Sequence, residues 1–371
     1  MGSLDALVAL SRRYGADPGW VLAGGGNTSL KIGRSLYVKA SGSALATIGE
    51  DGFCAIDLDR LDAVWSASYP EGTEAREEAA LADLMAARVQ GEAKRPSVET
   101  LMHGLFPQSF VVHTHPSIVN GLACSKGGKA AFDRLFGEDG IWVPFVDPGY
   151  ILAKTVRSAL EAFRERKGRA PSIMLMQNHG LLVAADETEG IDELSRSVVE
   201  RIRTGIHREP DLAAVPVDMA ALSRAAEILR ELAAEGAALR FLSDAETTHR
   251  ASGPESFAAI SSAFTPDHIV YAGHEFLFSA EGIEGMRPAW SAYRARNGSP
   301  PRVALVRGLG AFAVASSDKA ADAAIALYAD ALKVAAYSES FGGPLHMTKE
   351  KIDFIRNWEV EKYRSKVGGG A

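Results

Sequence analysis

Hydrophobic residues recur along this chain at two spacings, one typical of helices and one typical of short strands. Helical spacing in the first half predicts helices over residues 4–14, 74–89, 98–105, 150–166 and 188–207. Strand-like runs lie at residues 28–32, 35–39, 110–113, 173–177 and 181–184. Strands thus alternate with helices, but several spacings are as short as those of hairpins. The pattern therefore predicts an α/β fold with a mixed or antiparallel sheet flanked by helices.

A break in the pattern near residue 207 predicts two domains, residues 1–207 and residues 208–371. The turn-forming residues Glu209-Pro210-Asp211 and Pro216 lie just after this point. Beyond them the pattern predicts helices over residues 219–234 and 319–337 and strands over residues 303–306 and 312–315. A chain of 371 residues is also long for one hydrophobic core.

Part of the second domain has the same sequence shape as part of the first. Residues 301–310 and 171–180 each contain a proline, an apolar run and a turn ending in glycine. In this pairing Leu309 takes the place of His179. The shape also arises without repetition, so a degenerate partial repeat remains one of two interpretations. If it is a repeat, the second domain has a structural or substrate-covering role.

Composition and charge limit the classes of function. The chain is 47% hydrophobic and 23% charged, as in soluble globular proteins, and its formal net charge is −7. This charge argues against binding nucleic acid through a broad basic surface. No run is long enough to span a membrane, and no secretory signal is visible. The two cysteines, Cys54 and Cys124, form no CxxC motif, so the expectation is a reduced, soluble, cytoplasmic protein.

Three histidines form a candidate metal site. His113 and His115 follow an apolar run and are two residues apart, so on a strand they point to the same face. His179 follows a second apolar run and could reach the same point from another strand. Three histidines with an open fourth position are typical of a catalytic divalent-metal site. An isolated His-x-His pair is more often two ordinary strand-end residues.

Loops rich in small residues supply candidate anion ligands. Residues 23–29, Ala-Gly-Gly-Gly-Asn-Thr-Ser, lead into a predicted strand and offer backbone N–H groups with the side chains of Asn27 and Ser29. A second loop, residues 40–43, contains Gly42, and Ser97 is the predicted N-cap of the helix at 98–105. A plain hairpin lead-in explains the first loop equally well. Together the loops suggest a phosphate pocket beside the metal.

Glu99 and His103 are four residues apart on the predicted helix at 98–105, and so lie on one face. A carboxylate near a metal would be a natural proton shuttle. Taken alone, such a pair is usually a solvated helix face.

The order of these motifs resembles the class II aldolase and adducin family. The shared motifs are Gly-Gly-Asn-Thr-Ser at 25–29, Ser-Gly at 41–42, Pro-Ser-Val-Glu at 96–99, His-Thr-His-Pro at 113–116 and Asn-His-Gly at 178–180. The family includes fuculose- and rhamnulose-1-phosphate aldolases and ribulose-phosphate 4-epimerases, with a three-layer fold around a mixed sheet. The resemblance covers residues 1–207. Later residues, such as Thr265-Pro266-Asp267-His268, resemble the aldolase portion of longer rhamnulose-1-phosphate aldolase/dehydrogenase chains, although no GxGxxG follows a strand here.

The resemblance implies a role for each candidate residue. His113, His115 and His179 would be the metal ligands, with Zn²⁺ the usual ion and Mn²⁺ or Co²⁺ the alternatives. Glu99 would be the catalytic acid/base, and Tyr150 is the nearest candidate for an assisting tyrosine. The expected phosphate ligands are Asn27, Ser29, Gly42 and Ser97. Val98 departs from the pattern, because phosphate-binding aldolases often carry a second serine there.

The function implied is that of a metal-dependent aldolase, a carbon–carbon lyase of carbohydrate metabolism. It would cleave a sugar or ketose phosphate similar to rhamnulose or fuculose 1-phosphate through a metal-stabilised enediolate. A decarboxylase of a 3-oxo sugar acid or a 4-epimerase would use the same chemistry. A non-catalytic, adducin-like binding protein is less favoured because all three histidines are present. The family further implies a homo-oligomer with no nucleic-acid or membrane partner.

Overall fold

The computed structural model describes residues 4–358, which form two compact units. The first contains residues 4–119 and 129–204, and the second contains residues 120–128 and 205–358. Residues 120–128, which the sequence pattern assigned to the first domain, are thus grouped with the second unit. No helix within 4–358 is long and apolar enough to cross a membrane.

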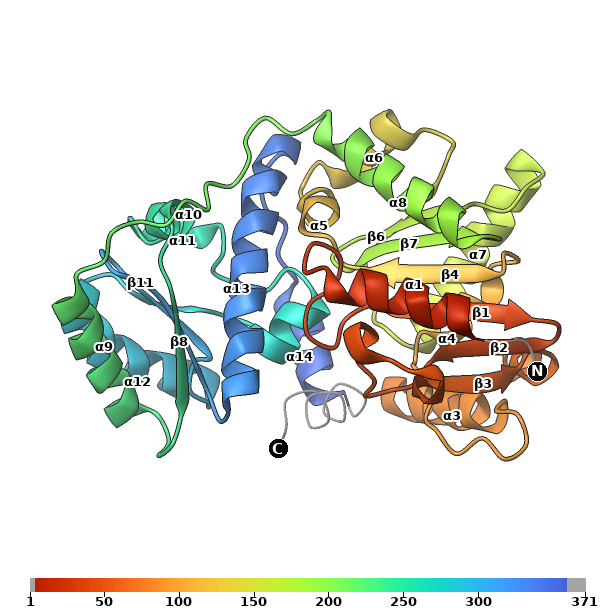
Figure 1. Ribbon diagram of the computed structural model, residues 1–371, viewed down its shortest axis with the longest axis horizontal. Helices are drawn as coiled ribbons and strands as arrows, with labels where there is room; N and C mark the ends of the chain where they lie inside the picture. The colour runs from red at the N-terminus through yellow and green to blue at the C-terminus, as the bar shows by residue number, and fades with distance from the viewer. Residues whose placement is uncertain (1–3, 359–371) are drawn as a thin grey trace. The chain divides into compact units, whose positions relative to one another are not determined.

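The first unit is built around a seven-stranded mixed sheet (Figure 1). Its strand order is β3-β2-β1-β4-β7-β6-β5. Only β5 and β6 are parallel; the other neighbours are antiparallel. The strands are β1 (Asn27–Ile32), β2 (Ser35–Lys39), β3 (Phe53–Asp57), β4 (Phe110–Thr114), β5 (Ile141–Val143), β6 (Ile173–Met176) and β7 (Gly180–Ala185). The mixed sheet predicted from the sequence is confirmed.

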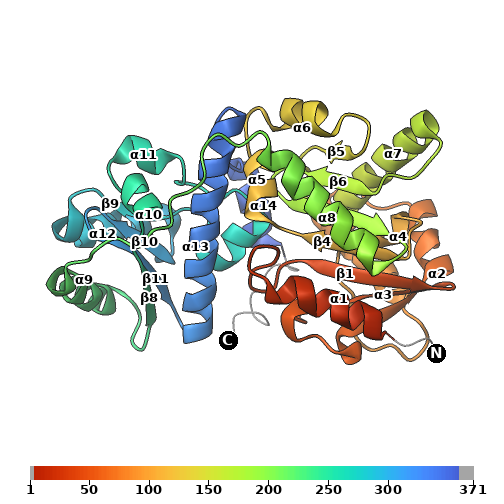
Figure 2. The same cartoon turned by 45° about the horizontal axis from the view of Figure 1, so that its top comes forward.

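Helices cover both faces of this sheet, which gives the three layers. One face packs against α3 (Thr73–Ala86), α4 (Thr100–Leu105) and α7 (Tyr150–Lys167) around a large apolar core. The other face carries α1 (Asp5–Ala16) and α8 (Thr188–Arg203) (Figure 2). The remaining helices named in this part of the chain are α2 (Leu58–Ala63), α5 (Ser117–Ala123) and α6 (Gly128–Phe136).

Most predicted elements are present, with shifts at their ends. The predicted helix at 4–14 continues through Gly15 to Ala16 as α1. The predicted helix at 98–105 begins two residues later, at Thr100, with Glu99 rather than Ser97 in the N-cap position. The hydroxyl of Ser97 instead accepts a hydrogen bond from the N–H of Glu99 (3.3 Å), which forms a turn before the helix.

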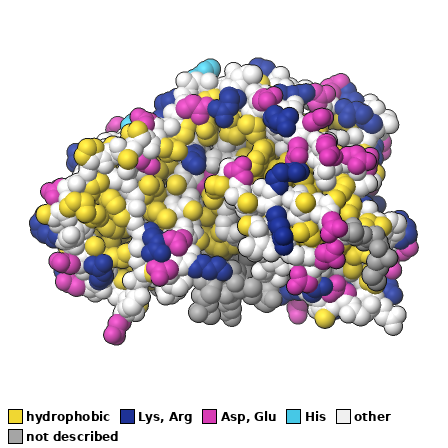
Figure 3. Space-filling view, in the orientation of Figure 1, with side chains coloured by type: hydrophobic (Ala, Val, Ile, Leu, Met, Phe, Trp, Pro, Cys, Tyr) yellow, Lys and Arg dark blue, Asp and Glu magenta, His cyan; other side chains and the backbone are white. Residues whose placement is uncertain are grey.

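Figure 3 shows the molecular surface in the orientation of Figure 1, with acidic and basic side chains interspersed over the visible face.

The second unit contains a four-stranded sheet in the order β8-β11-β10-β9. The strands are β8 (Ala238–Leu242), β9 (Leu277–Ser279), β10 (Val303–Val306) and β11 (Gly310–Ala315). The helices are α9 (Met219–Leu232), α10 (Ala245–Arg250), α11 (Pro254–Ala258), α12 (Met286–Asn297), α13 (Asp318–Ser338) and α14 (Lys349–Asn357). A π-helical turn, η4 (His268–Ala272), is fully buried.

The central hairpins of the two sheets, β6–β7 and β10–β11, share a register at an offset of 130 residues. In the first unit Ile173 pairs with Val183, and in the second Val303 pairs with Ala313; both positions differ by 130 (303 − 173 and 313 − 183). β5 runs parallel to β6, as β9 does to β10. β8 pairs with β11 as β4 pairs with β7. Four strands and the helix after them therefore follow the same order in both units.

Candidate metal centre

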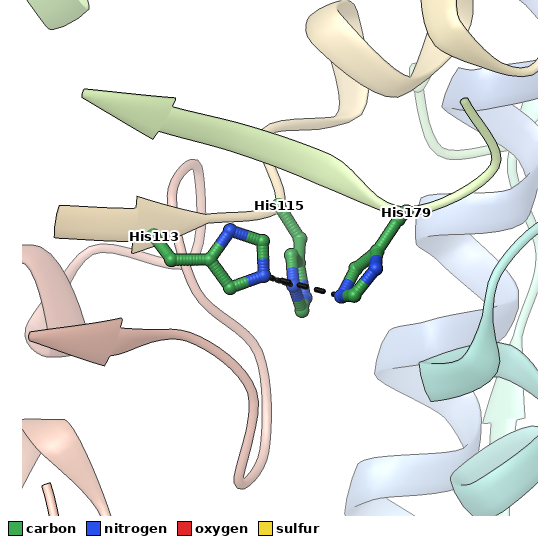
Figure 4. A group of neighbouring side chains, drawn as sticks. All are labelled: His113, His115 and His179. Atoms are coloured by element: carbon green, nitrogen blue, oxygen red, sulfur yellow. Dashed lines mark hydrogen bonds between the residues drawn. The ribbon is translucent and has the colours of Figure 1, made fainter. Parts of the chain in front are cut away.

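The three predicted metal ligands converge in the first unit (Figure 4). His113 lies on β4, His115 follows the end of that strand, and His179 lies in the turn between β6 and β7. The Nε2 atom of His113 is 2.9 Å from Nε2 of His115 and 3.2 Å from Nε2 of His179. Three ring nitrogens this close together are stable only with a proton or a cation between them, so the donor set fits a divalent metal.

Backbone contacts orient the central ligand. His113 is fully buried, and its Nδ1 lies 2.8 Å from the carbonyl oxygen of Leu181. Because that carbonyl can only accept, Nδ1 carries the proton and Nε2 presents a lone pair to the other histidines. Metal-ligating histidines typically donate their second ring nitrogen in this way.

The turn that carries His179 depends on the residues on either side of it, Asn178 and Gly180. Asn178 has a φ of 52°, in the left-handed region that asparagine tolerates better than most residues. A Cβ on Gly180 would lie 2.6 Å from Cδ2 of His115 and 2.6 Å from the carbonyl oxygen of Thr114. Only glycine therefore lets β7 begin this close to the ligands.

Glu99 lies directly beside the histidines. Its Oε1 is 3.3 Å from Nε2 of both His113 and His179, and its Oε2 accepts a hydrogen bond from Nδ2 of Asn27 (3.2 Å). Burial alone raises the pKa of Glu99, but the rings of His113 and His179 outweigh burial and hold the pKa well below its usual range. The low pKa keeps the carboxylate of Glu99 ionised. Its side chain is 19% exposed, so the carboxylate remains accessible.

Burial keeps His179 neutral near pH 7. It lowers the pKa of His179 to about 4. An ionised Glu99 beside the ring nitrogens of His113 and His179 offers a negative charge and lone pairs to a cation. Metal binding needs deprotonated ligands, so this site is prepared for a cation at neutral pH.

The predicted phosphate loops adjoin the histidine strand. Asn27 pairs in register with His113, and a Cβ on Gly26 would lie 3.1 Å from the carbonyl oxygen of His113. The buried amine of Lys39 donates to the carbonyl oxygens of Gly24 (3.0 Å) and Gly26 (2.7 Å). Lys39 thus holds the glycine loop in place, a role that the sequence analysis missed.

The second loop and Ser97 are also neighbours. The N–H of Ser41 donates to the carbonyl oxygen of Arg95 (2.8 Å), and Ala40 bridges to Pro96. Gly42 has a φ of 90°, which favours glycine. Ser97 accepts from the N–H of Glu99, which leaves its hydroxyl proton available to donate.

Two predicted site residues have other surroundings. The hydroxyl of Ser29 is fully buried and lies 2.8 Å from Nδ1 of His103. Tyr150 is 9% exposed and belongs to the apolar core, where its ring packs against Trp65 and Tyr69. Within the described residues, the ring of Tyr150 packs against these two aromatic rings rather than against the histidines. Its catalytic role stays a prediction.

The sequence matches a known domain family over residues 5–191, that of the class II aldolase and adducin N-terminal domain. The protein belongs to the class II aldolase and adducin family. Membership supports an enzyme of the aldolase, epimerase and decarboxylase type. Class II aldolases use a divalent metal, which agrees with the histidine triad.

Similar proteins are known from sequence and from structure. The "Uncharacterized oxidoreductase YuxG" of Bacillus subtilis (strain 168) is 24% identical, and the match covers 97% of this chain but 58% of that protein. The N-terminal class II aldolase domain of a Thermoplasma acidophilum protein is 30% identical, covers 55% of this chain and 93% of that chain, and has a TM-score of 0.47. For L-fuculose-1-phosphate aldolase from Thermus thermophilus the identity is 16%, the coverage 54% and 94%, and the TM-score 0.35.

Proposed function

We propose that this protein is a metal-dependent carbon–carbon lyase that cleaves a sugar or ketose phosphate similar to rhamnulose or fuculose 1-phosphate. The observation that carries the proposal is the position of Glu99, whose Oε1 lies 3.3 Å from two of the three converging histidines. A purely structural metal site does not require an ionised, partly exposed carboxylate beside its ligands. A lyase needs a base at that point.

The residues of the site would have two distinct roles, metal binding and proton transfer. His113, His115 and His179 would hold the ion, most often Zn²⁺ in this family. When bound, a divalent ion polarises the substrate's oxygen atoms and stabilises negative charge that develops on them. Glu99 would take the proton from the substrate hydroxyl during cleavage and return a proton during condensation.

Substrate anchoring would fall to the loops that adjoin the triad. Asn27 pairs in register with His113, and the loop that contains Gly42 is bridged at Ala40 to Pro96, the residue before Ser97. Backbone and hydroxyl donors are good phosphate ligands, and fixing the phosphate sets the reacting bond against Glu99. Tyr150 is the remaining proposed assistant.

We also propose that residues 1–207 form the catalytic domain and that residues 208–371 contain a degenerate partial copy of it. The shared register of the hairpins β6–β7 and β10–β11 supports this. In the register of the copy, Leu309 takes the place of His179, and Phe241 on β8 takes the place of His113 on β4. Neither residue binds metals, so we expect one ion per chain.

We propose a homo-oligomer, which family membership supports. We also propose a cytoplasmic location, which the two buried free cysteines support. Light scattering after size-exclusion chromatography would measure the assembly. A monomeric mass at micromolar concentration would contradict the oligomer.

The proposed reaction is tested by incubating the metal-loaded protein with phosphorylated ketoses and sugar acids. Aldehyde release from a ketose 1-phosphate, lost in Glu99→Gln, is the expected result. Release of CO₂ from a sugar acid would instead identify a decarboxylase, and interconversion of pentulose phosphates a 4-epimerase. No product from any substrate would contradict catalysis and favour an adducin-like binding protein.

A further inference from the structure

One fully buried polar contact beside the site has no explanation in packing. His103 on α4 is 0% exposed, and its Nδ1 lies 2.8 Å from the hydroxyl of Ser29 on β1, also 0% exposed. Burial lowers the pKa of His103 to about 3, so the ring is neutral near pH 7. An apolar residue would fill this position without the cost of burying an imidazole.

This contact is one of several that join the same two elements. Asn27, Ser29 and Lys31 alternate along β1 and so share one face. Asn27 donates to Glu99, and the amine of Lys31 donates to the carbonyl oxygen of His103 (2.9 Å). Glu99 and His103 lie one turn apart and are joined by the bond from the N–H of His103 to the carbonyl oxygen of Glu99 (3.1 Å).

The helix that carries Glu99 depends on such contacts. α4 has six residues and no side-chain hydrogen bond at its N-cap. A helix this short has little stability of its own. The bond between Asn27 and Glu99 involves a carboxylate that is 19% exposed, so water can compete for it. The hydrogen bond between Ser29 and His103 is shielded from water, so it is the stronger of the two.

We propose that His103 is a positioning residue that, through Ser29, holds α4 against β1 and so fixes the carboxylate of Glu99 beside the histidine triad. The kinetic part of this inference rests on the proposed lyase function. The metal-binding part does not, because Glu99 adjoins two metal-ligand candidates whether or not the protein cleaves a substrate.

Four variants test the role. His103→Leu and Ser29→Ala each remove the contact, whereas His103→Asn keeps a polar atom close to the position of Nδ1. The matched control is Thr28→Val, which removes the 2.7 Å contact between the buried hydroxyls of Thr28 and Ser11. Thr28 is next to Ser29 on β1 but faces away from the site, toward α1.

The first readout is the visible absorption of the Co²⁺-loaded protein, calibrated with Glu99→Gln. We expect His103→Leu and Ser29→Ala to bind one Co²⁺ per chain and to shift the absorption bands in the direction that Glu99→Gln shifts them. His103→Asn should restore most of the wild-type spectrum, and Thr28→Val should match the wild type. A wild-type spectrum for both His103→Leu and Ser29→Ala would overturn the inference.

The second readout separates kcat from KM. A displacement of the order of 1 Å can lower a rate about 100-fold, so we expect kcat to fall by roughly 10- to 100-fold with little change in KM. A raised KM with unchanged kcat in Ser29→Ala would instead make Ser29 a substrate ligand and overturn the positioning role. If His103→Leu does not fold, Ser29→Ala carries the test. If the wild type cleaves nothing, the proposed function fails while the Co²⁺ spectra still decide this inference.

Discussion

Replacing Gly180 by alanine tests the geometry of the histidine cluster most locally. The added Cβ would lie 2.6 Å from the carbonyl oxygen of Thr114, which belongs to the ladder between β4 and β7 and cannot withdraw. It would also lie 2.6 Å from Cδ2 of His115, a side chain that can move. The ring of His115 should therefore swing away from the other two.

The magnitude follows from the loss of ligand alignment. Disturbing the surroundings of a metal ligand typically lowers metal affinity about 10- to 100-fold, and overpacking costs about 1–3 kcal/mol of stability. We expect Gly180→Ala to reach at least this loss of affinity, measured by competition with a chromogenic chelator. Thermal unfolding of the metal-free protein would measure the stability change separately.

The second unit supplies a matched control. A Cβ on Gly310 would lie 2.6 Å from the carbonyl oxygen of Leu242, and its φ of 151° also favours glycine. Gly310→Ala should therefore destabilise the protein without changing metal affinity. Wild-type metal affinity in Gly180→Ala would show that the close approach of β7 does not set the position of His115. An equal loss of affinity in both variants would show that the effect is global rather than local.

Three further predictions concern the acid/base residue, acid stability and the second unit. Glu99→Gln should retain metal and substrate affinity but lose about 100-fold or more in kcat, the usual size of a general acid/base contribution; an unchanged rate would remove Glu99 from the mechanism. His103 takes up a proton near pH 6.5 when unfolded but only near pH 3 when folded, so the free energy of unfolding should fall by about 1.4 kcal/mol per pH unit as pH drops through this window. His103→Asn should flatten that slope in urea titrations, and an unaltered slope would contradict the assignment. Glu246, which is 1% exposed, accepts from Arg208 (2.7 Å) and pairs with Arg250 (2.9 Å), so Glu246→Gln should lower stability by up to about 3–5 kcal/mol in denaturant titrations, with metal affinity unchanged.

Elements with a clear hydrophobic pattern could be predicted from the sequence, and elements without one could not. The predicted strand at 303–306 has the bounds of β10, and α7 and α13 lie within one residue of the predicted ends. β5 has only three residues, too few to show alternation. Every residue of β8 is half-buried, so its two faces do not differ in burial. The π-helical turn η4 is buried throughout and has no helical periodicity to detect.

The convergence of the histidines was predictable, whereas their supporting contacts were not. The His-x-His spacing and the Asn-His-Gly turn are local patterns that point to a ligand set. The bonds from Asn27 to Glu99 and from Ser29 to His103 join residues more than 70 positions apart. No local pattern records such pairs, so the sequence could name Asn27 and Ser29 as polar site residues but not their partners. The role of Lys39 was missed because its partners are backbone carbonyls 15 and 13 residues away, although a lysine that ends a strand beside a small-residue loop is a usable signal.

We expect His113, His115 and His179 to hold a catalytic divalent metal. The most direct test of this expectation is the metal content per chain of the purified protein and of His113→Ala, measured by elemental analysis after loading with Zn²⁺ and removal of the excess. The histidine cluster should give one tightly held ion per chain in the wild type and none in the variant. An equal, tightly held ion in both proteins, or none in either, would contradict this expectation.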